Sequence, residues 1–356
     1  MADKKGDLEK TKRVPLGAAL PLLDDLRRMI DETRQGVAVT VNAALTTLYW
    51  RIGKRISEEI LKGERAEYGQ QILATLSQEL VRDYGNGFSY SALTRMIKLS
   101  QVFPEPKIVA TLSQTLSWSH FIELLPLERP LQRDFYAEMC RLERWSVRTL
   151  RQKIDSMLYE RTAISGKPEQ LIRHELDALR NEDRLTPDLV FKDPYFLDFL
   201  GLRDRYLEKD LEDAILRELE QFLLELGAGF SFIARQKRIQ IDNDDYYIDL
   251  LFFNRKLRRL VAIDLKLGDF KPADKGQMEL YLRWLDKYER QDDENPPLGL
   301  VLCAGKKRET VELLEIEKSG IRVAEYLTEL PPRDVLVGKL HKALGHARKQ
   351  FQDQLE

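Results

Sequence analysis

Two carboxylates and one ammonium stand inside otherwise apolar stretches of this chain. Residues 246–254 read YYIDLLFFN and residues 257–268 read LRRLVAIDLKLG, with Asp249, Asp264 and Lys266 among the apolar residues. Strands buried on both faces are normally apolar throughout, so charges at these positions need a reason. Like charges held together under partial burial repel one another, and a hard divalent cation such as Mg²⁺ or Mn²⁺ offsets that repulsion. A neighbouring ammonium can orient a water molecule or stabilise developing charge on phosphorus.

The two stretches predict a β-hairpin with its turn at residues 256–257. In that register Asp249 and Asp264 are cross-strand partners on one face, and Lys266 shares the face because side chains alternate along a strand. The apolar residues of the other face should pack under a helix; they are Leu250, Phe252, Ile263 and Leu265. A metal held by two carboxylates grips a phosphate oxygen and lowers the pKa of a bound water, as phosphodiester hydrolysis requires. The structural alternative is a three-membered salt-bridge cluster at a strand end.

The segments around this hairpin predict an α/β domain. We expect a helix over residues 208–227, strands over 230–241, 246–254 and 257–268, and a helix over 273–290. A strand over 298–305, a helix over 309–318 and a strand over 321–327 follow. This order of elements is typical of a mixed central sheet covered by helices. We therefore place this domain at residues 206–330, after a connecting arm over 166–205 and before a C-terminal helix within 331–356.

Residues 16–165 predict an all-helical domain, which makes the fold class α+β with two domains. Apolar residues recur at helical spacing over 44–61 and 68–85, and the second run stops at Gly85. A further helix follows with Thr94, Arg95 and Lys98 on it, so the pair resembles a DNA-binding helix–turn–helix. An ordinary helical hairpin explains the pattern equally well, and a dimerisation role is the other option for this domain.

A row of arginines gives a second candidate contact with nucleic acid. Arg144, Arg148 and Arg151 are spaced i, i+4 and i+7, which places them on one face of a predicted helix. Contact with backbone phosphates is the functional interpretation, and a solvated helix face is the structural one. The net charge of −2 neither supports nor excludes a nucleic-acid partner.

Composition excludes several classes of protein. No apolar run is long enough to span a membrane, and the charged start MADKKGDLEKTKR has no apolar stretch behind it, so we expect neither membrane nor secretion signal. Two cysteines far apart, Cys140 and Cys303, suit a reducing cytoplasm. The four histidines show no zinc-ligand spacing; they are His120, His174, His341 and His346.

The hairpin residues resemble the PD-(D/E)xK nuclease superfamily, which puts an Asp on one strand and (Asp/Glu)-x-Lys on the next. Here these are Asp249 and the triplet Asp264-Leu265-Lys266. Gln277 and Tyr281 match the QxxxY signature of the following helix in that superfamily. The chain departs from the superfamily pattern in two ways: Asp264 stands where we expect Glu, and Ile248 stands where the motif's proline would be.

A closer resemblance is to the YhcG-type family, whose nuclease-like domain follows a helical domain. The stretches FLLELGAGFSFIARQKRI, YYIDLLFFNRKLRRLVAIDLKLGDFKPADKGQMELYL and LSWSHFIELL carry it. The resemblance implies a Mg²⁺- or Mn²⁺-dependent endonuclease acting on DNA. It implies that Asp249, Asp264 and the Leu265 carbonyl hold the metal, and that Lys266 positions or activates the attacking water. Gln277 and Tyr281 would brace the site or touch the scissile phosphate.

The same resemblance suggests further site residues and leaves alternatives open. The first core helix should supply a Glu, for which Glu212 is the first choice and Glu218 the second. The strand before the hairpin offers DNA contacts through Arg235, Gln236 and Arg238. A homodimer is expected by analogy with single-site nucleases that cut both strands. The alternatives are a catalytically inactive DNA-binding or scaffold protein with this fold, and a junction-specific or RNA-directed nuclease.

Overall fold

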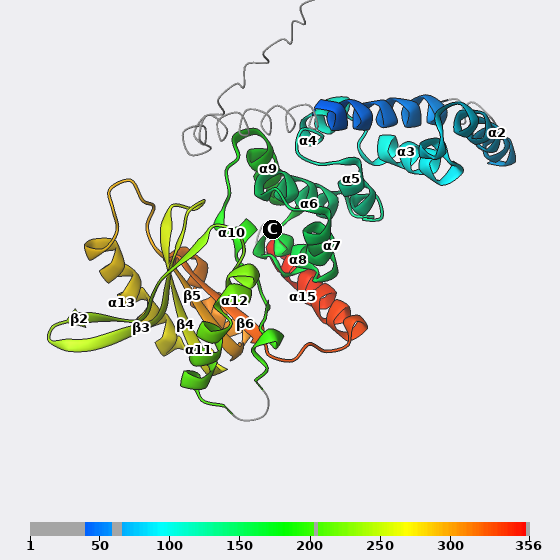
Figure 1. Cartoon of the computed structure of the whole chain (residues 1–356). Helices are drawn as coiled ribbons and strands as arrows, with labels where there is room; N and C mark the ends of the chain where they lie inside the picture. Colours follow the sequence, from blue (N-terminus) through cyan, green and yellow to red (C-terminus); the bar gives the residue numbers. More distant parts are fainter. Residues whose placement is uncertain (1–39, 59–65, 203–205, 354–356) are drawn as a thin grey trace, which may run out of the picture. The chain divides into compact units, whose positions relative to one another are not determined.

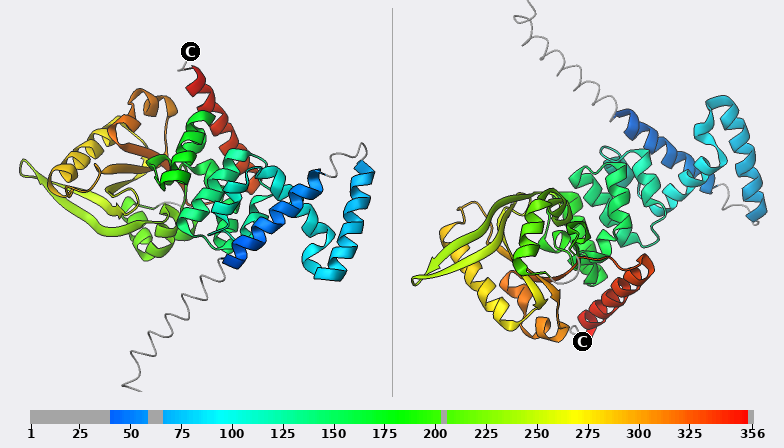
Figure 2. Two further views of the ribbon diagram at one scale, coloured as in Figure 1. Left: turned by 90° about the horizontal axis from the view of Figure 1, so that it is seen from above. Right: turned by 60° about the horizontal axis from the view of Figure 1, so that its bottom comes forward.

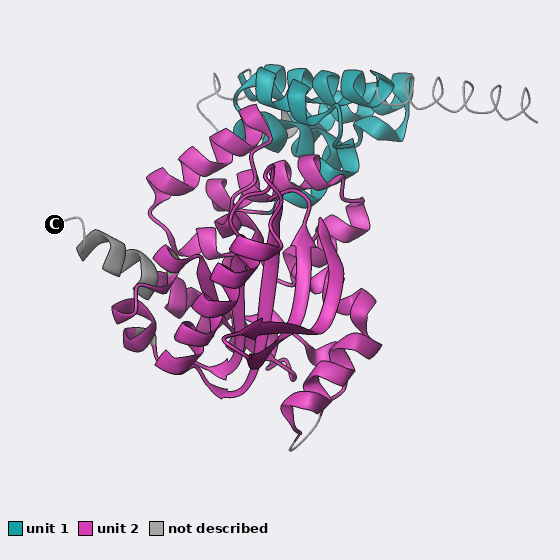
Figure 3. Ribbon diagram, turned by 90° about the vertical axis from the view of Figure 1, so that its left-hand side faces the viewer, with its two compact units in different colours: residues 1–126 teal, residues 127–356 magenta. Residues whose placement is uncertain are grey.

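The computed structural model of the chain describes residues 40–58, 66–202 and 206–353 (Figure 1). Contacts between Cα atoms divide the chain into two compact units, unit 1 over residues 1–126 and unit 2 over residues 127–356 (Figure 3). The boundary at residue 126 precedes the one at residue 165 that we predict from the sequence, so the helices between these positions cluster with the sheet. The functional extents of the four predicted segments stay predictions.

Unit 1 is helical throughout its described part. A helix over residues 40–58 is followed by α2 (Ala66–Tyr84), η1 (Asn86–Phe88), α3 (Tyr90–Val102), α4 (Pro106–Leu112) and α5 (Trp118–Leu124). Ile56, Leu73, Leu93 and Met96 form a buried cluster that holds the first three helices together. The predicted all-helical character of this region is confirmed.

The predicted helix–turn–helix pair corresponds to α2 and α3. Gly85 directly follows α2 with a φ of 86°, a backbone conformation that glycine adopts without steric cost and that ends the helix as predicted. Thr94, Arg95 and Lys98 lie on α3 and are exposed. A role of these side chains in DNA binding stays a prediction.

Unit 2 opens with a second group of helices. These are α6 (Pro130–Glu143), α7 (Val147–Asp155), α8 (Leu158–Arg161), η2 (Ala163–Gly166), α9 (Glu169–Glu182) and α10 (Pro187–Val190). The prediction that Arg144, Arg148 and Arg151 share one helix is wrong for Arg144. This residue follows the end of α6 in a left-handed conformation with a φ of 52°, and α7 begins only after the N-cap Ser146.

The centre of unit 2 is a mixed six-stranded sheet in the order β1-β6-β5-β4-β3-β2. The strands are β1 (Tyr195–Phe196), β2 (Phe230–Ile241), β3 (Asp244–Asn254), β4 (Arg259–Asp269), β5 (Leu298–Gly305) and β6 (Ile321–Leu327). The pairs β2–β3 and β3–β4 are antiparallel, whereas β4–β5, β5–β6 and β1–β6 are parallel. The sheet confirms the predicted fold class, and β1 adds an edge strand from within the predicted connecting arm.

Helices cover both faces of the sheet (Figure 2). On one face lies α13 (Pro272–Tyr288), whose Met278, Leu282 and Leu285 pack against Leu251 of β3 and Ala262 of β4. On the other lie α11 (Glu208–Arg217) and α12 (Leu219–Leu226). The α12 ring of Phe222 packs at 6.0 Å from Phe252, so the apolar face opposite the two Asp residues is helix-covered as predicted. η3 (Asp198–Leu200), α14 (Arg308–Leu313), η4 (Ile316–Ser319) and α15 (Arg333–Asp353) complete unit 2.

The single helix predicted over residues 208–227 is two helices. Glu218 has φ −106° and ψ 33°, which ends α11 and starts α12. The break lets Phe222 pack on the sheet while Glu212 lies at the end of the sheet where the candidate site is found. Neither glycine nor proline marks it in the sequence.

Candidate active site

The candidate site lies where β3 and β4 separate. Their paired register runs from Asn254↔Arg259 to Leu250↔Ile263, and Asp249 and Asp264 are the next positions in the same register. In place of a further backbone pair, the backbone N–H of Leu265 donates a 2.8 Å hydrogen bond to Oδ2 of Asp249. The predicted turn at residues 256–257 is thus confirmed, whereas Asp249 and Asp264 lie just beyond the last backbone pair and are not the direct cross-strand partners that we predict.

Asp264 and Lys266 form an ion pair inside this split. Nζ of Lys266 lies 2.8 Å from Oδ2 of Asp264, whose residue is only 2% exposed. Burial raises the pKa of Asp264 and the charge of Asp249 raises it further, to about 7, although Lys266 acts in the opposite direction. Burial alone would lower the pKa of Lys266, but Asp264 and Asp249 raise it above its ordinary value. Lys266 is therefore a protonated ammonium at neutral pH.

Glu212 enters the site from α11 and has both carboxylate oxygens engaged. Nε of Arg235 donates to its Oε1, and Nε2 of Gln236 donates to its Oε2 at 2.8 Å. The same Gln236 nitrogen donates to Oδ1 of Asp249 at 3.0 Å. Glu212 is thus linked through one amide group to the carboxylate of β3. Glu218, the second choice from the sequence, is exposed at the end of α11 and takes no part in these contacts.

Arg235 and Arg238 are both engaged with carboxylates of unit 2. Besides its contact with Glu212, Arg235 places Nη2 at 2.7 Å from Oδ1 of Asp213. Arg238 pairs with Asp245 across the β2–β3 hairpin at 2.8 Å. These ion pairs compete with any contact to a phosphate, and the predicted role of both arginines in DNA binding stays a prediction.

The QxxxY residues of α13 connect that helix to β3. Nε2 of Gln277 donates to the hydroxyl oxygen of Tyr281 at 2.5 Å, and the Tyr281 hydroxyl donates to the backbone carbonyl of Tyr247 at 3.0 Å. Burial raises the pKa of Tyr281, and the charges of Asp264 and Asp249 raise it further although the Gln277 hydrogen bond opposes them. The pair therefore lies beside the carboxylates and anchors α13 over the site.

One further carboxylate at the site, Glu208, was not predicted from the sequence. Oε1 of Glu208 accepts a 3.3 Å hydrogen bond from the backbone N–H of Leu267, just after the lysine of β4. Glu208 precedes Glu212 by one helical turn, so both side chains of α11 reach toward the same end of β4. The i, i+4 spacing of these two glutamates was the available signal.

The donor set of the site fits a hard divalent cation at Asp249 and Asp264. Oδ2 of Asp264 is buried, and the Lys266 ammonium lies 2.8 Å from it. A buried carboxylate whose charge is disfavoured by a second carboxylate nearby is a suitable ligand for such a cation. In the described ranges no three His, Cys, Asp or Glu side chains are grouped to hold a metal. Metal ligation by Glu212 and by the Leu265 carbonyl stays a prediction.

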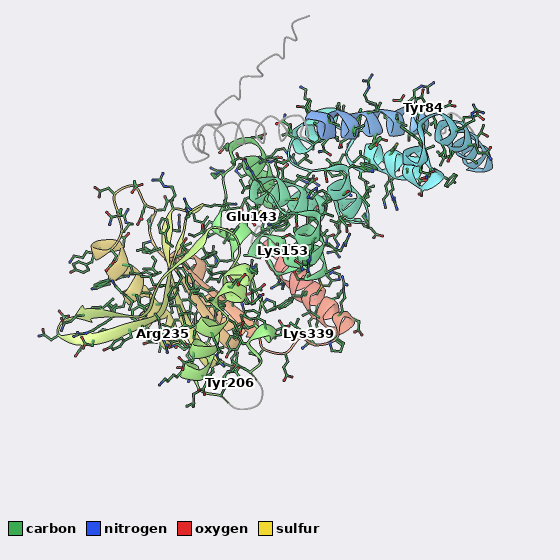
Figure 4. The ribbon with its side chains drawn as sticks, in the orientation of Figure 1. Tyr84, Glu143, Lys153, Tyr206, Arg235 and Lys339 are labelled. Carbon is green, nitrogen blue, oxygen red and sulfur yellow. The ribbon has the colours of Figure 1, made fainter. Side chains whose placement is uncertain are left out.

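The predicted arginine row lies away from these residues. In α7, Nζ of Lys153 donates to the carbonyl of Leu224 at 3.2 Å, near the start of β2. Nζ of Lys256, in the turn between β3 and β4, lies 3.7 Å from Oε1 of Glu143 at the end of α6. Figure 4 shows Glu143 and Lys153 well separated from Arg235. The row is therefore at the turn end of the sheet, opposite the strand split.

Comparison with known protein families gives two matches that together cover most of the chain. Residues 25–161 match the family described as "DUF1016 N-terminal domain", and residues 188–341 match the one described as "YhcG PDDEXK nuclease domain". A protein of Escherichia coli (strain K12), named "Putative nuclease YhcG", is 35% identical over 348 residues, which is 89% of this chain and 92% of that protein.

Solved structures resemble only part of the chain. A repair endonuclease from Pyrococcus abyssi is 19% identical and covers 37% of this chain, with a TM-score of 0.25. A complex of EndoMS with double-stranded DNA is 17% identical over 36% of this chain, with a TM-score of 0.27. The chain spans about half the length of each, 50% and 49% respectively. At such low scores these likenesses carry no argument about mechanism.

Proposed function

This chain belongs to the family that joins a DUF1016 N-terminal domain to a YhcG PDDEXK nuclease domain, and from that premise we propose that it is a metal-dependent endonuclease hydrolysing phosphodiester bonds of DNA. The observation that carries the proposal is the meeting of Asp249, Asp264 and Lys266 at the split between β3 and β4.

Asp249 and Asp264 would hold the cation, which we propose to be Mg²⁺ or Mn²⁺ because both favour carboxylate oxygens. When bound, such an ion polarises a phosphate oxygen and lowers the pKa of a coordinated water. The Leu265 N–H bond to Asp249 fixes the orientation of that carboxylate before any ion arrives. Glu212 is the further ligand that we propose from α11, which requires it to exchange its present partners.

Lys266 supplies a fixed positive charge beside the reacting phosphate. Its pKa is raised by the two Asp residues, so it acts as a hydrogen-bond donor and not as a neutral base. We assign it the positioning of the attacking water and the stabilisation of negative charge on the phosphate oxygens. Gln277 and Tyr281 hold α13 against β3 and so restrict the movement of the helix that covers the site.

We propose that the DNA extends from the strand split toward the turn end of the sheet. Arg144 and Arg148 are exposed there and make no ion pair among the described side chains, and Arg151 is exposed as well. Asn254 lies at that end and Asp249 at the split, a separation of about 17 Å at ~3.3 Å per strand residue. Contacts at both ends would engage phosphates several nucleotides apart on one duplex.

Assembly and location are further parts of this proposal. One set of catalytic residues cuts one strand, so we propose that the protein acts on duplex DNA as a homodimer. No helix within the described ranges is long and apolar enough to cross a membrane. Both cysteines are unpaired and buried. Free thiols suit the reducing cytoplasm, where we propose that the protein works.

The proposal is tested by incubating the full chain with supercoiled plasmid, linear duplex, branched DNA, single-stranded DNA and RNA, each with Mg²⁺, Mn²⁺ or EDTA. We expect metal-dependent cleavage of duplex DNA by the wild type and none by Asp249→Asn or Asp264→Asn. Binding of DNA without cleavage of any substrate would favour a scaffold protein. Cleavage confined to branched DNA or to RNA would replace the proposed substrate.

A further inference from the structure

The side chain of Gln236 lies between two carboxylates of the candidate site. Its amide nitrogen is 2.8 Å from Oε2 of Glu212 and 3.0 Å from Oδ1 of Asp249. A carboxamide nitrogen carries two N–H donors, so it can serve both acceptors at once. Glu212 comes from α11 and Asp249 from β3, and without the amide these two like charges would face each other without a shared donor.

The backbone at Gln236 is unusual for its residue type. Its φ of 46° lies in the left-handed region, which residues with a β-carbon adopt at a steric cost. The flanking pairs Arg235↔Leu250 and Lys237↔Ile248 keep the same register, so this conformation does not arise from an inserted residue. A strained residue at the centre of a polar site points to a function for its side chain.

Gln236 is exposed, whereas Glu212 is only 6% exposed. An exposed amide can rotate into solvent and exchange its two protein hydrogen bonds for bonds to water at a small net loss. The carboxylates of Glu212 and Asp249 then point their oxygens at the position that the amide nitrogen occupied. A divalent cation at that position would replace the amide, since it also attracts both carboxylates and offsets their repulsion.

We propose that the Gln236 amide stands in for the cation: it joins Glu212 to Asp249 in the metal-free protein and leaves when a divalent ion binds. This inference rests on the proposed metal-dependent function and assigns Gln236 a positioning role distinct from the DNA contact predicted from the sequence. One consequence is thermodynamic. The stability that the amide gives to the metal-free protein must be given up on binding, so removing the amide weakens the metal-free fold and tightens cation binding by the same factor.

The variant Gln236→Asn tests this inference, because Asn tolerates a left-handed backbone but is one methylene shorter and reaches only one carboxylate. Gln236→Gly is the second variant, since it removes both the amide and the steric cost. Gln240→Asn is the matched control, an exposed glutamine four residues further along β2. The measurements are Mn²⁺ titration by calorimetry and thermal unfolding of the full chain in EDTA and in saturating Mn²⁺.

We expect both Gln236 variants to bind Mn²⁺ about threefold to tenfold more tightly than the wild type and the control. We also expect Gln236→Asn to melt a few degrees lower than the wild type in EDTA, with the difference lost in saturating Mn²⁺. Unchanged or weaker Mn²⁺ binding by both variants, while the wild type binds, would overturn this inference alone. No Mn²⁺ binding by the wild type would overturn it together with the proposed metal dependence. The expected shifts without any DNA cleavage would support it and contradict the nuclease function.

Discussion

At the scale of single residues, Asp264 is a carboxylate whose negative charge the metal-free protein disfavours. The pKa of Asp264 is raised from 3.8 to about 7 by burial and by Asp249. Between these values the folded state binds a proton that the unfolded state has released. The free energy of unfolding of the metal-free protein therefore gains a contribution at low pH that is lost as the pH rises toward 7.

Asp264→Asn should for this reason be more stable than the wild type in EDTA at pH 7.5, by about 1–3 kcal/mol. The difference should shrink toward pH 4, because the wild-type carboxyl is then neutral too. Urea denaturation at both pH values checks this, with Asp292→Asn in an exposed loop as the control. A variant less stable than the wild type at pH 7.5 would argue against the paired-carboxylate arrangement.

Lys266→Ala separates charge stabilisation from metal binding. The ammonium lies 2.8 Å from Asp264 and competes with a cation for that oxygen. We expect DNA cleavage to fall about 100-fold or more, a typical loss for a positioned catalytic group, while Mn²⁺ affinity is kept or rises. Single-turnover cleavage and Mn²⁺ calorimetry measure the two effects. Loss of both together would mean that Lys266 is needed for the geometry of the site.

At the scale of elements, the hairpin could be predicted because two apolar runs flank a short basic turn. The position of that turn then sets which residues of the two strands lie opposite each other. The face shared by Asp249, Asp264 and Lys266 followed from the period of two along the strands. The break at Glu218 was not predictable, because no Gly or Pro marks it. The break at Arg144 has one mark in the sequence, Ser146, which caps the start of α7. The bridge from Glu212 through Gln236 to Asp249 depends on how α11 packs on the sheet, which local spacing does not encode.

The element that we expect to hold the DNA backbone at the turn end is α7. Its residue Arg148 is exposed and has no ion-pair partner in the described part of the chain. Arg148→Ala should weaken duplex binding and lower the slope of log affinity against log salt by roughly one, without changing Mn²⁺ affinity. Fluorescence anisotropy at several salt concentrations measures the slope. The control is Arg283→Ala on α13, which is also exposed to solvent. An unchanged slope for Arg148→Ala would mean that this face of α7 contacts only solvent.

At the scale of the whole molecule, the helices before the sheet and the sheet itself stabilise each other within unit 2. Glu225 of α12 is partly buried, and burial raises its pKa, but Lys192 and Arg161 together bring it below its ordinary value. Arg161 pairs with Oε1 of Glu225 and also contacts the Phe196 ring at 3.7 Å. Arg322 of β6 forms a second ion pair of this kind, with Nη2 at 2.9 Å from Oδ1 of Asp188 in α10. These partners all precede residue 206.

A fragment limited to residues 206–330 should therefore fail to fold stably, because it leaves Glu225 and Arg322 without their partners. Residues 127–356 contain all of these pairs and should unfold cooperatively as one unit. Circular dichroism during thermal unfolding compares the two fragments. A cooperative transition in the shorter fragment would show that the predicted nuclease segment is independent of the helices before it.

The central claim is that Asp249 and Asp264 meet at the split between β3 and β4 to bind the ion that enables phosphodiester hydrolysis. Anomalous diffraction from a crystal of the full chain soaked in Mn²⁺ tests it most directly. We predict a strong anomalous peak between these two carboxylates, absent from crystals of Asp264→Asn. A peak only at other positions, or none at saturating Mn²⁺, would contradict the account.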